Sequence, residues 1–298
     1  MNKVSKGKGC LKLLLAVLLL CPVQSLFAGG NIQPGIELFN KAEYQKAYEY
    51  FDAIESGSEN EKNPEFQYYY GLSLYKTDQA KEAVKAMKSA LTLEPENAEY
   101  QFAMTMVYLL RMGEVSVFRK PGLFGALKKT MKAAANHEPM HLAAMRFYTG
   151  WLLYAPGIGG GDVDEGMVYL EKLKEFSEAD GFLFEAGLAN RGEDYARAEE
   201  LYLKAIELKS SPSIHMGVAR YYLEQEKYEQ AISYANTFNL LPKRWSDRGN
   251  SEGHLILAGS YHYLGDAAAF EEHSKMAFNL AGNKATRERV EKFLDDLE

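Results

Sequence analysis

The fold of this chain is decided by residues 64–97, which read PEFQYYYGLSLYKTDQAKEAVKAMKSALTLEPEN. Apolar residues recur at helical spacing in both halves of this stretch, and a polar turn separates the halves. In the second half Ala83, Met87 and Ala90 share one helix face, and Pro95 prevents the helix from continuing. Two such short helices cannot bury their apolar faces alone, so the pattern predicts that they stack against copies of themselves.

The copies are visible along the chain with a period in the mid-thirties. Gly71 follows Gly35 by 36 residues, and Ala83 follows Ala47 by the same interval. Each copy has a small residue in its first helix, then an alanine, a bulky residue and another alanine in its second. The best matches are Gly71, Ala83, Met87, Ala90 and Pro95, then Ala186, Ala198, Tyr202 and Ala205, then Ala219, Tyr222, Ala231 and Pro242, then Ala258, Tyr261 and Ala277. By these residues the chain resembles the tetratricopeptide repeat (TPR) family, although Phe270 stands where the last copy should carry alanine.

The resemblance implies an all-α, right-handed superhelical solenoid of about six or seven helix pairs, closed by a C-terminal capping helix. The whole chain after the leader is expected to form one solenoid domain. The expected boundaries are 1–28 for a signal peptide and 29–298 for the solenoid, with repeats at about 30–63, 64–97, 98–139, 140–178, 179–211, 212–244 and 251–282 and the cap at 283–298.

The first 28 residues have the layout of a secretory signal peptide. Four lysines precede and interrupt an apolar run that ends near Leu20, and cleavage is expected after Ala28. The run is shorter than the roughly 20 residues of a membrane-spanning helix. Leu26 is bulky for its place near the cleavage site, so an uncleaved anchor stays open. Leu20 before Cys21 argues against a lipoprotein signal.

Cleavage would leave a cysteine-free, acidic protein. Cys10 and Cys21 both lie in the leader, so the mature chain would have no disulfide and no thiolate nucleophile or ligand. The leader carries four lysines and no acid, so its removal moves the net charge from −7 to −11. Such a charge disfavours nucleic acid and anionic membrane surfaces as partners. We expect an exported, periplasmic protein with no membrane span after cleavage.

One short motif suggests metal chemistry, and another suggests anion binding. Residues 137–141 read HEPMH and satisfy the H-E-x-x-H pattern of zinc proteases, which requires a continuous helix. Pro139 interrupts that helix, so we interpret the segment as a turn between repeats. The glycine-rich loop Gly157–Asp162 lacks both nucleotide-binding patterns and is interpreted as structural, with exposed amides at the next helix as the anion-binding alternative. No catalytic residues, metal or cofactor are predicted.

The concave face is the expected binding surface, because the first helices of such arrays line a groove. The repeats place Phe39, Tyr68, Leu72, Tyr75, Phe102, Met106 and Leu109 in its N-terminal half and Arg191, Arg220 and His262 in its C-terminal half. Exposed apolar side chains of this kind mark a binding surface, and the arginines could hold a carboxylate. The alternative is a closed superhelix, in which the apolar residues contact the leader-proximal segment, the irregular insertion or another subunit.

The sequence therefore predicts a non-enzymatic scaffold or adaptor that binds a protein or peptide partner in its groove. The alternative is a periplasmic module that binds a small hydrophobic ligand, as some transporter-associated TPR proteins do. A zinc peptidase using His137 and His141 is the third and weakest hypothesis.

Overall fold

The computed structural model describes residues 31–55 and 59–297, and every regular element in them is helical. Three short 3₁₀ helices, η2 (Glu59–Lys62), η3 (Val117–Arg119) and η4 (Gly157–Gly159), lie between the longer helices. The α-helices are α1 (Gln33–Asn40), α2 (Tyr44–Glu55), α3 (Pro64–Lys76), α4 (Ala80–Leu93), α5 (Ala98–Glu114), α6 (Lys120–Ala135), α7 (Leu142–Tyr154), α8 (Val163–Phe176), α9 (Glu178–Arg191), α10 (Tyr195–Leu208), α11 (Pro212–Glu224), α12 (Tyr228–Leu240), α13 (Asn250–Leu264), α14 (Ala267–Asn279) and α15 (Lys284–Asp295).

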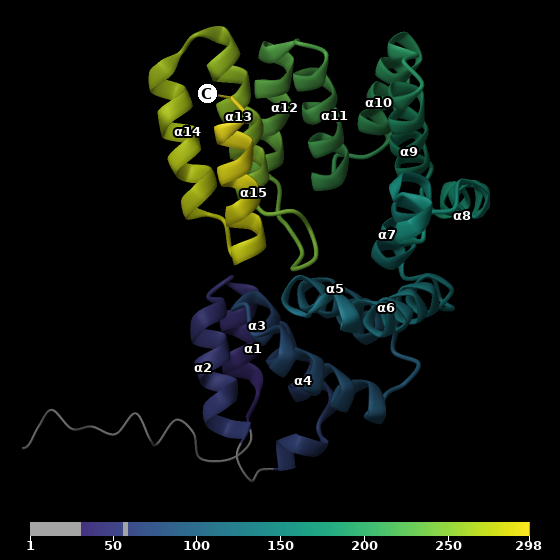
Figure 1. Ribbon diagram of the computed structural model, residues 1–298, viewed down its shortest axis with the longest axis vertical. Helices are drawn as coiled ribbons and strands as arrows, with labels where there is room; N and C mark the ends of the chain where they lie inside the picture. The colour runs from purple at the N-terminus through teal and green to yellow at the C-terminus, as the bar shows by residue number, and fades with distance from the viewer. Residues whose placement is uncertain (1–30, 56–58, 298) are drawn as a thin grey trace, which may run out of the picture.

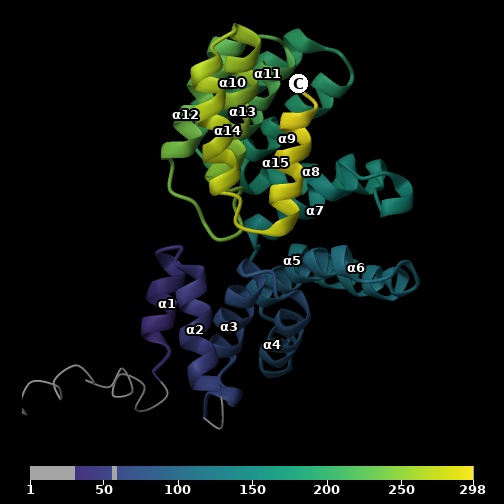
Figure 2. The ribbon, with the colours of Figure 1, turned by 60° about the vertical axis from the view of Figure 1, so that its left-hand side comes forward.

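The helices pack in consecutive pairs, from α1 with α2 to α13 with α14, and each pair packs on the next. The predicted all-α repeat solenoid is confirmed. Helix α15 follows the last pair and packs against α13 and α14, where Val290 is fully buried beside Leu255 and Ala277. Figures 1 and 2 show helices α1–α6 and helices α9–α15 as two stacks, with α7 and α8 between them.

Small residues set the close approach of the two helices in a pair. Gly71 of α3 faces α4, and a Cβ atom at this position would lie 2.9 Å from the Cε atom of Met87. Ala83 and Ala90 on α4 are fully buried. Asn63 begins α3 by accepting hydrogen bonds from the backbone amides of Glu65 and Phe66, which satisfies donors that have no partner inside the helix. The local sequence thus fixes both where the helices begin and how tightly they pair.

The buried side chains form one large cluster in each stack. The N-terminal cluster runs through α1–α6, and the C-terminal cluster runs through α9–α13. A smaller group made by Phe102, Ala134 and Ala144 connects α5, α6 and α7. This group also receives Trp245 from the linker between α12 and α13, so a residue far along the chain packs between the two stacks.

The predicted signal peptide, residues 1–28, lies outside the described residues. Within residues 31–55 and 59–297, no helix combines the length and the apolarity that crossing a membrane would require.

The H-E-x-x-H segment does not lie on a helix, because α6 ends at Ala135 and α7 begins at Leu142. His141 caps α7, and its Nδ1 atom accepts a hydrogen bond from the amide of Ala144. Its Nε2 atom lies 2.7 Å from a carboxylate oxygen of Glu99. Both ring nitrogens of His141 are therefore engaged in contacts that position α7.

The glycine-rich loop between α7 and α8 is an obligate tight turn. Gly160 adopts the left-handed conformation, with φ of +81°. A Cβ atom on Gly161 would lie 1.8 Å from the carbonyl oxygen of Ala155. This distance is a steric clash, so only glycine fits at this position. Asp162 then caps α8 by accepting a hydrogen bond from the amide of Glu165 at 3.0 Å. The loop therefore serves to reverse the chain and start α8.

We expect Gly161→Ala to lower the free energy of unfolding by at least about 2 kcal/mol, because the backbone must move to admit the new methyl group. Urea denaturation followed by circular dichroism measures the change. Gly157→Ala is the matched control, since no atom lies within 4 Å of a Cβ atom there. Equal stability losses in the two variants would contradict the role assigned to Gly161.

Candidate functional site

The apolar residues predicted to line the N-terminal groove are covered in the structure. Phe39, Tyr68, Leu72 and Phe102 are buried, and Leu72 has no exposed surface. Tyr75, Met106 and Leu109 are half-buried. The prediction that these side chains form an open surface is wrong. Phe39 packs against Tyr44 and Tyr69 of the neighbouring helices, and a distant part of the chain covers Tyr75 and Phe102.

The covering segment is the linker 241–249 between α12 and α13. The indole ring of Trp245 packs 5.8 Å from the ring of Phe102 and 6.4 Å from that of Tyr75, measured between centroids. The Lys76 ammonium donates a 2.6 Å hydrogen bond to the Trp245 carbonyl. Both views show this linker reaching from the C-terminal stack toward α5 (Figures 1 and 2). The superhelix therefore closes, by a segment that sequence reasoning did not single out.

The carboxylate of Glu99 at the start of α5 holds the linker in place. It accepts hydrogen bonds from the Trp245 indole Nε1 at 2.8 Å and the Tyr68 hydroxyl at 2.7 Å, in addition to its contact with His141. The Arg244 guanidinium lies 3.2 Å from the same carboxylate. Burial raises the pKa of Glu99, but the hydrogen bonds from His141, Tyr68 and Trp245 outweigh it and lower the pKa to about 2.

A second contact closes the superhelix at the capping helix. The backbone amide of Lys284, the first residue of α15, donates a 2.8 Å hydrogen bond to a carboxylate oxygen of Asp78. Asp78 lies in the turn between α3 and α4, and its backbone has a positive φ of 61°. The N-terminal and C-terminal stacks are thus joined through Trp245 at Glu99 and Lys76, and through Lys284 at Asp78.

What remains open on the concave face is a pocket of about 220 Å³ beside the linker. The first helices of four consecutive pairs contribute to its walls, and α12 and the linker complete it. Its lining residues are Phe102, Ala143, Arg146, Phe147, Leu183, Phe184, Pro212, Ser213, Met216, Phe238, Ser246, Asp247 and Arg248. Phe147, Leu183 and Met216 give it apolar walls, and Arg146 and Arg248 give it a basic component.

Arg248 belongs to a cluster in which three arginines surround one carboxylate. Arg248 and Arg220 lie 3.5 and 3.6 Å from the same oxygen of Glu252, and Arg289 contacts its other oxygen. The Glu252 side chain is 8% exposed, whereas those of the arginines are about half exposed. Burial and the nearby Arg220 guanidinium lower the pKa of Arg248. The cluster carries an excess of positive charge, so a further carboxylate would be stabilised there.

The three residues predicted for the C-terminal half do not form one site. Arg220 joins the arginine cluster. Arg191 is exposed but donates a 3.2 Å hydrogen bond to the carbonyl of Leu153. His262 packs at 5.3 Å against the ring of Phe270 on α14. A contact between any of these three residues and a partner remains a prediction.

The sequence does contain a signal for the missed linker. Residues 245–250 fall between the last two predicted repeats, and they begin with one of only two tryptophans in the chain. A large aromatic residue outside the repeat pattern is costly to expose and indicates a packing partner elsewhere. Its partner could not be identified, since Glu99 lies 146 residues away.

The part of the chain that the structure describes contains no candidate metal-binding site. No group of three or more His, Cys, Asp or Glu side chains converges there in a way that could hold an ion. His254 and His273 do lie together, with their Nδ1 atoms 3.1 Å apart, but they hydrogen-bond to each other.

The low pKa of Glu99 predicts that the folded protein loses stability as the pH falls. A carboxylate whose pKa falls from 4.5 to about 2 on folding contributes stability above pH 4.5 that is lost as the pH falls toward 2. We expect Glu99→Gln to cost about 2–3 kcal/mol at pH 7 and to flatten the unfolding free energy between pH 4.5 and 2. Chemical denaturation at a series of pH values measures both effects.

The control for this prediction is Glu82→Gln, which changes an exposed carboxylate on α4. It should leave the stability and its pH dependence close to those of the unchanged protein. If Glu99→Gln retains the full acid destabilisation, the Glu99 carboxylate does not hold the superhelix closed.

Comparisons with known proteins support the fold alone. No protein-family model and no curated protein matches the sequence. A solved structure of a tetratricopeptide repeat protein from Parabacteroides merdae is similar over 88% of this chain and 96% of its own, with a TM-score of 0.55 and 15% identity. The structure of the human IFIT1 dimer with PPP-AAAA is similar over 87% of this chain, with a TM-score of 0.51 and 18% identity.

This chain spans 61% of the IFIT1 chain but nearly all of the Parabacteroides protein. At such identities the likeness extends to the arrangement of helices and not to the residues of any site. Together with the seven helix pairs and the terminal helix in the described residues, it shows that this chain has the fold of the tetratricopeptide repeat proteins.

Proposed function

We propose that the protein is a non-enzymatic scaffold that binds a segment of a partner protein across the concave face of α7–α13. The observation that carries this proposal is the 220 Å³ pocket formed by the first helices of consecutive pairs. Phe147, Leu183 and Met216 would receive an apolar side chain of the partner. The neighbouring Arg248 would face a carboxylate of the same segment.

The volume of the pocket favours a side chain over a free small molecule. Pockets for drug-sized ligands usually measure about 300–1,000 Å³, and this pocket is smaller. The N-terminal groove, which could have enlarged it, is filled by Trp245. A small hydrophobic ligand, the alternative from the sequence, therefore has less support than a protein segment that places one side chain in the pocket.

The arginine cluster supports an acidic residue or a chain terminus in the partner segment. Arg220, Arg248 and Arg289 share one carboxylate, so a second carboxylate could pair with them without displacing Glu252. Arg220 was predicted to hold a carboxylate, and its contacts are compatible with that role. The partner segment would then combine an apolar anchor with a negative charge a few residues away.

To test this surface, peptides selected from a displayed random library against the purified protein would be titrated by fluorescence polarisation. We expect Leu183→Lys to weaken binding by about tenfold or more, because it places a charge in the apolar wall. Leu203→Lys on the second helix α10 is the matched control and should leave the affinity unchanged. Equal losses in the two variants, or the absence of any selected peptide, would contradict the proposal.

We further propose that the protein acts in the periplasm after removal of residues 1–28. The basic and apolar pattern of those residues supports export. We expect the protein isolated from its own cells to begin at Gly29, as measured by N-terminal sequencing or intact mass. A mature chain that begins at Met1 would contradict cleavage.

A further inference from the structure

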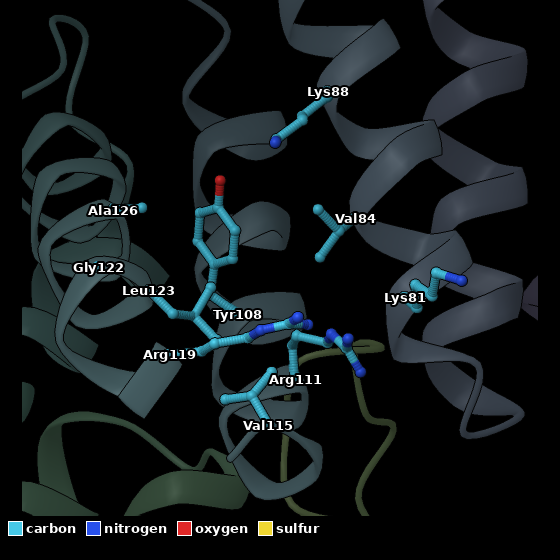
Figure 3. Close-up of a pocket in the computed structure, with 10 residues that line it drawn as sticks. All are labelled: Lys81, Val84, Lys88, Tyr108, Arg111, Val115, Arg119, Gly122, Leu123 and Ala126. Carbon is cyan, nitrogen blue, oxygen red and sulfur yellow. The ribbon is translucent and has the colours of Figure 1, made fainter. Parts of the chain in front are cut away.

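A second pocket lies outside the concave site, between α4, α5, η3 and α6. Its volume is about 350 Å³, and it shares no lining residue with the concave pocket. Figure 3 shows the side chains that surround it. They are Lys81, Val84, Lys88, Tyr108, Arg111, Val115, Arg119, Gly122, Leu123 and Ala126.

The charge of this pocket is opposite to that of the protein. Four of its ten lining residues are basic and none is acidic, in a chain with a net charge of −7. Lys81, Lys88 and Arg119 form no ion pair within residues 31–55 and 59–297. Arg111 is paired at 2.5 Å with Glu114, which lies outside the lining. Three unpaired cations beside Arg111 repel one another, so a bound anion would stabilise the arrangement.

Tyr108 supplies an independent indication of a ligand. It is only 7% exposed, and its hydroxyl has no hydrogen-bond partner among the residues that the structure describes. In Figure 3 the hydroxyl points toward the part of the pocket where the Lys88 ammonium lies. Burial raises the pKa of Tyr108, so the hydroxyl keeps its proton and can donate. The hydroxyl oxygen is not among the fully buried atoms that lack a partner, so it is open to the pocket and can donate to a ligand oxygen there.

The remaining wall of the pocket is apolar. Val84 on α4, Val115 beyond α5, and Leu123 and Ala126 on α6 line it between the basic side chains. The volume falls in the range of about 300–1,000 Å³ that is usual for small-molecule sites. A ligand of this pocket would therefore carry both a compact anionic group and an apolar part.

We propose that this pocket binds a small organic phosphate. The guanidinium groups of Arg111 and Arg119 match the oxygens of a phosphoryl group in geometry, and two further cations suit its double negative charge. The Tyr108 hydroxyl donates to a third oxygen. The organic part of the ligand packs against Val84 and Leu123.

The test uses phenyl phosphate as the probe, titrated into the full protein by isothermal calorimetry at fixed ionic strength. We expect saturable binding of one molecule per chain, tighter than that of inorganic phosphate because only the ester has an apolar part. Benzoate, which has the ring but a singly charged carboxylate, should bind more weakly than phenyl phosphate.

Arg119→Gln should weaken the binding of phenyl phosphate by about tenfold, because one charge-assisted contact is lost. This side chain is exposed and makes no ion pair in the described residues, so its replacement should not disturb folding. Tyr108→Phe removes only the hydroxyl and should weaken binding by about threefold or more. The control is Lys128→Gln, an exposed lysine on α6 outside the pocket, which should change the affinity by less than about twofold.

Absence of saturable binding would overturn the proposal. An equal loss in Lys128→Gln and Arg119→Gln would also overturn it, because binding would then reflect only general charge attraction. Benzoate binding as tightly as phenyl phosphate would overturn the assignment to phosphate. These outcomes do not bear on the concave surface, because neither Arg119 nor Tyr108 belongs to its lining.

Discussion

The shape of this solenoid depends on the carboxylate of Glu99. This partly buried charge accepts a hydrogen bond from the indole of Trp245, which lies 146 residues away in the chain. It also contacts Tyr68 and His141 of the N-terminal half. A carboxylate held by several donors is strongly ionised, and replacing any donor leaves part of that charge unpaired. The contact therefore joins the two stacks of helices and keeps the linker fixed against α5.

Closure at Glu99 determines which part of the concave face can bind. The aromatic residues of α3 and α5 would be an open groove if the superhelix continued without this contact. The side chain of Trp245 occupies the space where a partner could otherwise bind. Only the pocket among α7, α9 and α11 remains accessible. The linker also contributes Arg248 to that pocket, so the same segment fills one half of the groove and shapes the other.

The two open pockets differ in chemistry because they lie on different parts of the repeat. The concave pocket is formed by first helices and the linker, with apolar walls and both charges present. The outer pocket lies where the irregular third pair departs from the repeat, and η3 adds Arg119 to a basic lining. An insertion in one repeat has thus formed a pocket that a regular pair would not provide.

The sequence by itself determined the helix pairs and their order. Gly71, Ala83 and Ala90 encode local packing at fixed spacing, and Pro139 keeps the H-E-x-x-H segment off a helix. The packing of Trp245 over Tyr75 and Phe102 could not be predicted in this way. A repeat pattern describes contacts between neighbours, whereas closure joins Glu99 to Trp245 across the chain. Only the tertiary structure decided which groove residues remain accessible to a partner. The curvature summed over seven helix pairs brings the linker 241–249 to the carboxylate of Glu99.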